Sequence, residues 1–252
     1  VITAHESGMA HGEIELLFTC AEEVGLFGMK CMEMDKINAD YCFVLDSGGP
    51  IGSAAVKAPF HLMFSVQVTG KAAHAGMEPE KGVNAIVAMS HMISKLPNGR
   101  VDDETTINVG IIKGGDATNI VTPKAVFDFE IRSLDKKKMK ELERKVVTIL
   151  KDEAKACGAR VKIESRLAYA GYSIKDNSPI LRLFEEACFT AKVKPVYEAS
   201  GGGSDTNILN AAGHKALNLS AGMNKVHTTA EFVKKKDLEK SARLCLALIE
   251  VS

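Results

Sequence analysis

Residues 60–70, FHLMFSVQVTG, form an apolar stretch that ends in a glycine and is followed by a turn-rich segment. From its periodicity and its bounding turn residues, this stretch is predicted to be a β-strand. An amphipathic helix is predicted after it, because apolar side chains recur at helical spacing at Val83, Ile86, Val87 and Ile93.

The segments after this helix are predicted to form two strands, a second helix and a last strand. Residues 105–115 and 125–133 predict two further strands, and a second amphipathic helix runs from about Met139 until Gly158 stops it. Residues 159–169 predict a last strand. The resulting order, β-α-β-β-α-β, is that of a ferredoxin-like plait. We expect it to form a domain of its own over residues 58–172.

The flanking segments alternate between strand and helix. This alternation is typical of an α/β domain with crossover connections. We therefore predict a discontinuous α/β domain, made of residues 1–57 and 173–252, into which the plait is inserted. Its predicted strands are 13–20, 39–50, 194–199 and 215–219, and its predicted helices are 25–34, 179–191, 205–212 and a C-terminal helix.

Composition excludes several classes of partner. The chain has 252 residues, with 32 Lys and Arg against 32 Asp and Glu, so it carries no basic surplus for nucleic acid or anionic membranes. No apolar run approaches the roughly 20 residues that cross a bilayer. The six cysteines form no CxxC pair, which favours free core thiols in a cytoplasmic protein over disulfides.

Acidic residues follow two of the predicted strands. Glu22 and Glu23 come directly after the first strand, and Asp46 ends the second. Ligands of open α/β sheets collect beyond the carboxyl ends of the strands, and clustered carboxylates need a cation to neutralise them. With a histidine such as His227, such a cluster suits zinc or manganese. Alternatively, the glutamates favour a helix N-terminus and Asp46 is a turn residue.

Other polar residues lie in loops and on strands of the plait. His74 occupies a turn-rich loop, and Asn119 and Arg132 could each reach a ligand carboxylate, although solvated surface positions explain all three equally well. The glycine-rich stretches 114–123 and 198–207 match no nucleotide-binding fingerprint. No serine has the GxSxG setting of a serine hydrolase.

Six segments together resemble the dinuclear-zinc aminoacylase and carboxypeptidase superfamily, most closely its peptidase T-like branch of tripeptide aminopeptidases. They occur in the order that the family has and span nearly the whole chain. They are LLFTCAEEVGLFG (16–28), VLDSGG (44–49), VTGKAAHAGMEPEKGVNA (68–85), GGDATNIVTPKAVFDFEIRS (114–133), SGGGSDTN (200–207) and VHTTAEFV (226–233).

The resemblance implies a role for each matching residue of the α/β domain. Glu22 matches the general acid/base, and Glu23 and His227 match ligands of one zinc ion. Asp46 matches a ligand of a second zinc, with manganese or cobalt as alternative metals. Such an enzyme cleaves an amide bond in a short peptide or an N-acyl amino acid.

The resemblance also implies roles for loop and plait residues. His74 matches a histidine that stabilises the reacting oxyanion, often supplied by a partner subunit, since the plait serves as a lid that pairs a homodimer. Asn119 and Arg132 match residues that hold the substrate. Gly202 and Gly203 match a loop beside the substrate.

One departure concerns the metal ligands. The family carries an earlier His-x-Asp segment and a bridging Asp, and residues 1–12 supply neither. We therefore expect the chain to be the C-terminal part of a longer enzyme and to be inactive on its own. Alternatives are a deacylase of N-acyl amino acids, or a non-catalytic module for dimerisation or ligand binding.

Overall fold

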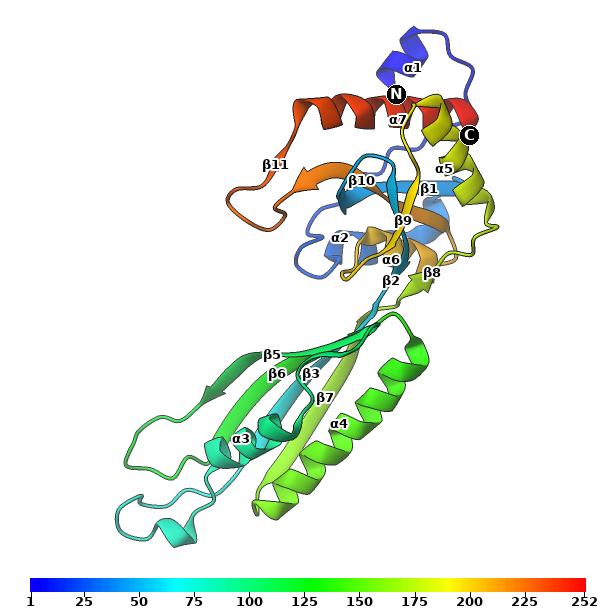
Figure 1. Cartoon of the computed structure of the whole chain (residues 1–252). Helices are drawn as coiled ribbons and strands as arrows, with labels where there is room; N and C mark the ends of the chain where they lie inside the picture. The colour runs from blue at the N-terminus through cyan, green and yellow to red at the C-terminus, as the bar shows by residue number, and fades with distance from the viewer. The chain divides into compact units, whose positions relative to one another are not determined.

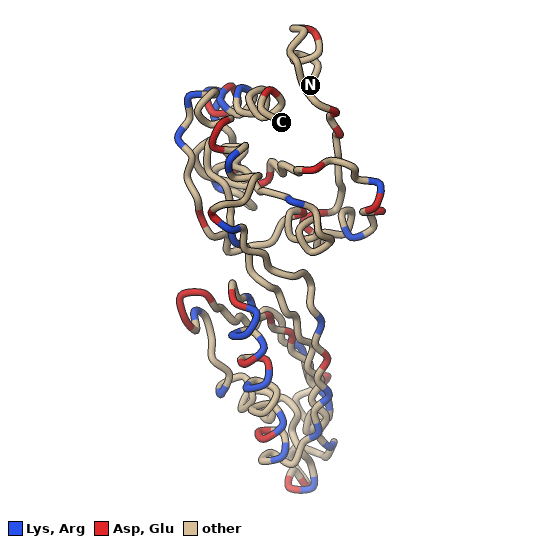
Figure 2. Tube along the Cα trace, turned by 90° about the vertical axis from the view of Figure 1, so that its right-hand side faces the viewer, with Lys and Arg blue, Asp and Glu red and all other residues tan.

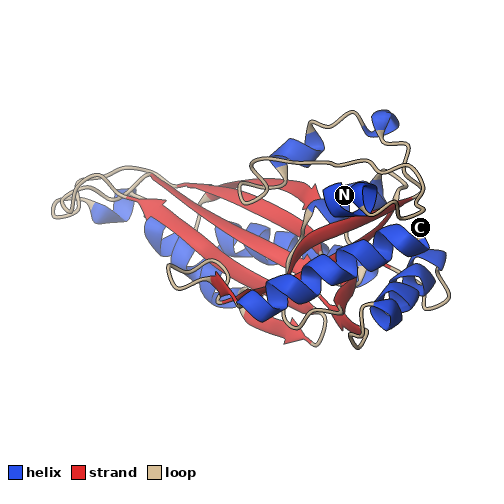
Figure 3. Ribbon diagram, turned by 90° about the horizontal axis from the view of Figure 1, so that it is seen from above, coloured by secondary structure: helices blue, strands red, loops and turns tan.

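The computed structural model describes all residues from Val1 to Ser252. The chain forms two compact units. The α/β unit comprises Val1–Ala58 and Ala170–Ser252, and the plait unit comprises Pro59–Tyr169. Figure 3 shows helices and strands throughout the chain, and the predicted class, an α/β catalytic-type domain with an inserted ferredoxin-like lid, is confirmed.

The plait unit is an antiparallel sheet in the order β4-β5-β6-β3-β7, and α3 and α4 pack side by side on one face of it (Figure 1). Its elements are β3 (Phe60–Thr69), the 3-10 helix η2 (Pro79–Lys81), α3 (Ala85–Lys95), β4 (Gly99–Asp102), β5 (Thr105–Gly114), β6 (Lys124–Ser133), α4 (Lys136–Ala156) and β7 (Arg160–Tyr169).

Side-chain patterning explains this unit. Every second residue of β6 is buried, so one face of the strand points into the core beneath the helices. Asn84 caps α3 by accepting hydrogen bonds from two backbone N–H groups, and Asp135 caps α4 in the same way. Lys and Arg residues alternate with Glu and Asp residues along α4 (Figure 2), as expected for a helix with one solvated face.

The α/β unit contains a six-stranded mixed sheet. Its elements are α1 (Ile2–Glu6), α2 (Phe27–Lys30), η1 (Met34–Lys36), β1 (Tyr41–Gly48), β2 (Ser53–Ala58), β8 (Tyr172–Ser173), α5 (Pro179–Thr190), β9 (Val196–Ala199), α6 (Asp205–Ala211), β10 (Lys215–Asn224), β11 (Phe232–Val233) and α7 (Lys235–Val251).

The central strand of this sheet is β10. It pairs in parallel with β1 and antiparallel with β2 and β11, and residues 216–220 are buried, as expected for a strand covered on both faces. Helices α5 and α7 pack on one side with Leu217 and Leu219. On the other side α2 and α6 form a smaller core around Met29 and Leu209.

Two predicted elements are wrong or incomplete. Residues 13–20 form no strand and make no ladder of hydrogen bonds with any strand of the sheet, although their apolar run suggests one. Phe18 is consequently 88% exposed. The helix predicted over 25–34 is reduced to the short helices α2 and η1; α2 begins only at Phe27, because Gly25 and Leu26 adopt positive φ angles that do not fit a helix. The sequence interpretation also missed β2 and the short strands β4, β8 and β11.

None of the helices is both long and apolar enough to cross a membrane. All six cysteines are free, as predicted. Of these, Cys188 is buried in the core and Cys20 and Cys31 are exposed, so the expectation that the cysteines are core thiols is wrong for the last two.

Candidate active site

The candidate site begins with the turn that carries the two glutamates. The Glu22 carbonyl accepts hydrogen bonds from the N–H groups of Gly25 (3.0 Å) and Leu26 (2.7 Å), and the Gly28 N–H donates to the Cys20 carbonyl (3.1 Å). These bonds close the chain into a compact turn directly before α2. Glu22 is half-buried within it, and Glu23 is exposed.

Glu23 and His227 come together from distant parts of the sequence. The Nδ1 atom of His227 lies 3.4 Å from Oε2 of Glu23, and both side chains are about 70% exposed (70% and 72%). His227 has a positive φ of 62°, and its N–H donates to the Glu231 carboxylate at 2.9 Å. The structure thus joins two residues that the resemblance assigns to one metal ion.

Asp46 lies at an irregularity of the β1–β10 pairing. Val44 and Leu45 pair in register with Asn218 and Leu219, and the register then shifts before Ser47. A bulge of this kind re-aims the side chain at that position. The side chain of Asn218 takes over part of the ladder: Oδ1 accepts from the Asp46 N–H (3.3 Å), and Nδ2 donates to the Asp46 carbonyl (3.1 Å).

The carboxylates of the site interact electrostatically. Burial, followed by the negative charges of Asp46, Glu23 and Asp205, raises the pKa of Glu22 to about 7. Burial and the charges of Asp205 and Glu23 also raise the pKa of Asp46. The charge of His227 opposes both shifts. Glu22 can therefore take up and release a proton near neutral pH.

The donor chemistry fits a divalent metal, because carboxylate oxygens and an imidazole nitrogen are the ligands of zinc and manganese sites. The arrangement does not complete such a site: no group of three His, Cys, Asp or Glu side chains lies close enough together to hold a metal ion. Glu23 and His227 supply a pair of donors, and Asp46 lies within electrostatic reach of Glu23.

Gly202 and Gly203 directly precede two buried residues to which the sequence assigned no role. Directly after them, Ser204 and Asp205 begin α6 and are 4% and 6% exposed. Oδ2 of Asp205 accepts a hydrogen bond from the Thr19 hydroxyl at 2.6 Å. The only sequence signal for this residue is an acidic side chain that follows a glycine loop.

Three predicted residues lie in the plait unit. Exposed His74 accepts hydrogen bonds through Nδ1 from Gly76 N and Met77 N, both at 3.2 Å. The loops of His74 and Asn119 pair with each other through a bridge between His74 and Ile120, and the Ala75 N–H donates to the Asn119 carbonyl.

The Arg132 guanidinium is already paired. Its Nε donates to Oε1 of Glu130 at 2.8 Å, and Nη2 lies 3.3 Å from Oε2. Glu130 also contacts His61, whose Nε2 lies 2.8 Å away. This cluster lies at one end of the plait sheet, because Arg132 pairs with His61 at the start of β3.

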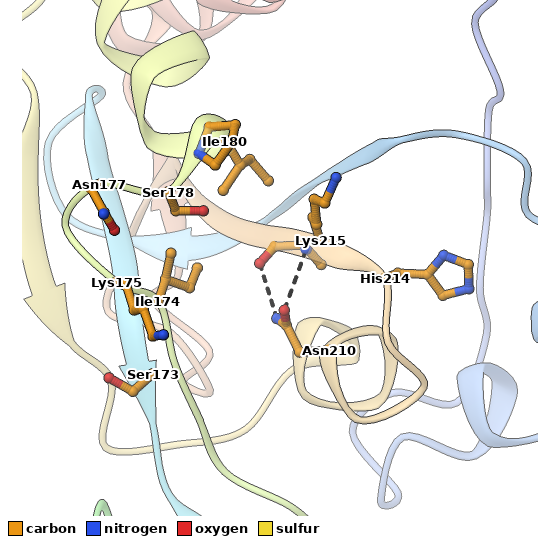
Figure 4. A pocket seen from close by; sticks show the side chains of 11 residues that line it. Ser173, Ile174, Lys175, Asn177, Ser178, Ile180, Asn210, His214 and Lys215 are labelled. Carbon is orange, nitrogen blue, oxygen red and sulfur yellow. Dashed lines mark hydrogen bonds between the residues drawn. The ribbon is translucent and has the colours of Figure 1, made fainter.

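A separate pocket in the α/β unit contains none of the predicted residues. It has a volume of about 350 Å³ and is lined at one side by Asn210, His214 and Lys215. Figure 4 shows Asn210 bonded to the backbone of Ala216, through Nδ2 to the carbonyl at 2.9 Å and through Oδ1 to the N–H at 3.4 Å. The pocket lies at the start of β10, whereas Asp46 lies opposite the middle of β10 and His227 follows its end.

Comparison with known proteins adds to this geometry. Residues 61–157 match the peptidase dimerisation domain of the M20 peptidases. A crystal structure of the aminopeptidase PepT from Bacillus cereus is 36% identical with a TM-score of 0.90, covering 99% of this chain and 67% of that one. A Staphylococcus aureus tripeptidase structure is 32% identical with a TM-score of 0.94, at the same coverage.

A curated relative from Bacillus subtilis, YqjE, is 37% identical over 97% of this chain. The chain spans 66% of that relative's length. Fold and sequence together define an M20-type peptidase scaffold with an inserted dimerisation domain. The chain belongs to the M20 peptidase family and is most similar to its peptidase T-like members.

Proposed function

We propose that the whole protein is a zinc-dependent peptidase that cleaves an amide bond in short peptides, with the specificity of a tripeptide aminopeptidase. The observation that carries the proposal is the contact between Glu23 and His227 at 3.4 Å. It joins, beside Glu22 and Asp46, the residue types that a hydrolytic metal site requires.

The metal ligands of this chain are Glu23 and His227 for one zinc and Asp46 for a second. Manganese or cobalt are alternative occupants. When bound, such ions polarise the carbonyl of the scissile bond as Lewis acids. These three residues alone do not form a complete metal site, so in this proposal the 252-residue chain is inactive by itself.

Glu22 is the proton carrier in this proposal. Its carboxylate accepts a proton from the attacking water and donates it to the leaving amine. A pKa of about 7 suits both steps, since a general acid/base works best when its pKa lies near the operating pH. Glu23, which is neutralised by the metal, leaves this function to its neighbour.

Substrate binding involves Gly202 and Gly203 beside the site, and Asn119 and Arg132 of the plait unit. Arg132 offers a guanidinium fork for the carboxylate of a peptide. The ion pair with Glu130 fixes the orientation of the Arg132 guanidinium. A substrate carboxylate would bind the guanidinium together with Glu130.

A homodimer through the plait unit is part of the proposal, and the separation of the plait residues supports it. Arg132 pairs with His61, whereas the loops of His74 and Asn119 extend from the far end of the sheet, beyond Thr69. The β3 residues from His61 to Thr69 extend over about 26 Å. One chain cannot bring both groups to one short peptide, so in this proposal His74 and Asn119 act from the partner subunit, with His74 as an oxyanion donor.

The six free cysteines and the balanced charge agree with a cytoplasmic protein. A second function is favoured by one observation, the incomplete metal cluster. On that basis the 252-residue chain alone could act only as a module for dimerisation or ligand binding.

The proposal is tested by assaying the whole protein, loaded with zinc, on three substrate types: free tripeptides, tripeptides with an acetylated N-terminus, and N-acetyl amino acids. We expect hydrolysis of the free tripeptides, with loss of activity on chelation and recovery on adding zinc. Activity confined to the N-acetyl amino acids would instead assign a deacylase. Absence of hydrolysis on all three would reject the peptidase.

A further inference from the structure

The segment that carries the two glutamates joins no sheet. Residues 13–20 pair with no strand, and the bonds of the following turn are local to residues 20–28. A catalytic group must be held to within about 0.5 Å of its productive position. Something other than a strand ladder must therefore position Glu22 and Glu23.

The hydroxyl of Thr19 provides that link. It donates to Oδ2 of Asp205 at 2.6 Å, an ordinary length for a charge-assisted bond between a hydroxyl and a carboxylate, which is stronger than a bond between neutral groups. Thr19 lies three residues before Glu22, and Asp205 is anchored in α6. The Glu15 carboxylate accepts a hydrogen bond from the Asn38 N–H at the other end of the segment, and the Thr19 bond ties the end nearest the glutamates to the packed part of the α/β unit.

Asp205 is buried in an unusual manner. It is 6% exposed, yet its second oxygen, Oδ1, has no hydrogen-bond partner. Its charge acts on both Glu22 and Asp46, so it lies beside the cluster. A buried carboxylate oxygen without a protein partner destabilises the fold, and a role in the adjoining site would explain its presence here.

Ser204, the residue before Asp205, is connected by hydrogen bonds to the segment that carries Asp46. The hydroxyl of Ser204 accepts a hydrogen bond from Nδ2 of Asn218 at 3.2 Å. Asn218 in turn bonds both the N–H and the carbonyl of Asp46 at the β1 bulge. The first two residues at the start of α6 thus contact both carboxylate-bearing segments, one directly and one through Asn218.

We propose that Asp205 is the positioning residue of the active site, holding the Glu22–Glu23 segment through Thr19 while Ser204 and Asn218 hold Asp46. This assignment rests on the proposed function for its catalytic consequence. The positioning itself is a property of the 252-residue chain.

The first test measures hydrogen exchange of the amides of residues 25–28 in the 252-residue chain, because these amides donate hydrogen bonds to the carbonyls of residues 20–22 and so report whether the glutamate turn stays closed. Thr19→Val removes the donor, Thr19→Ser keeps the hydroxyl, and Asp205→Ala removes the acceptor. We expect Thr19→Val and Asp205→Ala each to speed exchange about tenfold, because a charge-assisted hydrogen bond is lost. The double variant should be no faster than either single variant. Thr19→Ser should resemble the wild type.

A matched control is Thr105→Val in the plait unit. It removes a buried hydroxyl–hydroxyl hydrogen bond to Ser133 of 2.9 Å, and it should leave exchange at residues 25–28 unchanged. Wild-type exchange in Thr19→Val, or additive effects in the double variant, would overturn the positioning role.

The second test separates positioning from a merely structural role. In the whole protein we expect Thr19→Val to lower kcat about 10- to 100-fold with little change in KM, since misplacement of a catalytic group affects the chemical step. Thr19→Ser should restore kcat. An unchanged kcat beside altered exchange would reject the catalytic consequence. A wild-type protein without peptidase activity would reject the proposed function but leave the exchange result to decide the positioning.

Discussion

The two adjacent glutamates differ in their surroundings, and this difference suits them to separate roles. Glu22 is half-buried among Asp46, Glu23 and Asp205, whose charges raise its pKa to about 7. Glu23 is exposed and lies against His227. The environment of Glu22 suits a group that carries protons at neutral pH. The environment of Glu23 suits a metal ligand.

A second carboxylate, Glu130 in the plait unit, shows the opposite shift. The hydrogen bond from His61 and those from Arg132 outweigh the effect of burial and lower the pKa of Glu130 to about 2. Because the folded state holds the ionised form, this group stabilises the fold above its ordinary pKa near 4.5. That stabilisation is lost as the pH falls toward 2.

We therefore expect Glu130→Gln to lower the free energy of unfolding by about 1–3 kcal/mol at pH 7, since hydrogen bonds to a charged group are lost. The difference in free energy of unfolding between the variant and the wild type should become smaller as the pH falls from about 4.5 to about 2. Urea titrations at several pH values measure it. Glu164→Gln, at an exposed pair with Lys162, is the control and should change little. A gap that does not depend on pH contradicts this explanation.

Individual residues were only partly predictable from the sequence. Motif resemblance pointed to Glu23 and His227, and the structure places them together. The same resemblance included Asp205 within SGGGSDTN but gave it no role. Its burial and its unpaired oxygen depend on packing between α6 and a segment far away in the sequence, which no local pattern encodes.

At the scale of elements, the glutamate turn depends on a glycine. A Cβ atom built at Gly28 would lie 2.2 Å from the Cys20 carbonyl oxygen and 2.9 Å from the Cys20 nitrogen. Both contacts involve backbone, which cannot move aside without opening the turn. Only glycine fits this close approach.

We expect Gly28→Ala to destabilise the α/β unit by about 2 kcal/mol or more, because the clash strains the backbone. Thermal unfolding followed by circular dichroism measures the change. The control is Gly201→Ala, where a Cβ would meet nothing within 4 Å, and its effect should stay within about 0.5 kcal/mol. Equal stability of the two variants would show that the turn relaxes without cost.

The long strands and the two α-helices of the plait were predictable because each carries its own signals, whereas the short β4 and η2 were missed. The strand predicted at 60–70 is β3, and the helix predicted to stop at Gly158 is α4. The predicted strand at 13–20 failed for a different reason. An apolar run becomes a strand only if a neighbour supplies hydrogen bonds, and the sequence of the run does not say whether one is present.

At the scale of the whole molecule, the proposed dimer makes a prediction for mixed subunits. His74→Ala and Glu22→Gln should each inactivate the whole protein. If His74 acts in the partner's site, a mixed dimer contains one site with both residues intact. Random mixing should then restore about a quarter of wild-type activity, because half of the dimers are mixed and each has one working site.

This recovery is measured by refolding the two variants together and assaying tripeptide hydrolysis, with light scattering to establish the oligomeric state. Each variant refolded alone is the control. A strict monomer, or mixing without recovery, would contradict a contribution of His74 across the interface.

The most direct test compares Glu22→Gln with Glu23→Gln in the whole protein, by zinc content and by tripeptide turnover. We expect Glu22→Gln to retain its zinc and lose turnover by about 10²- to 10⁴-fold, the contribution of a general acid/base. Glu23→Gln should lose zinc together with activity. Retention of most of the turnover by Glu22→Gln would contradict the division of roles between the two glutamates.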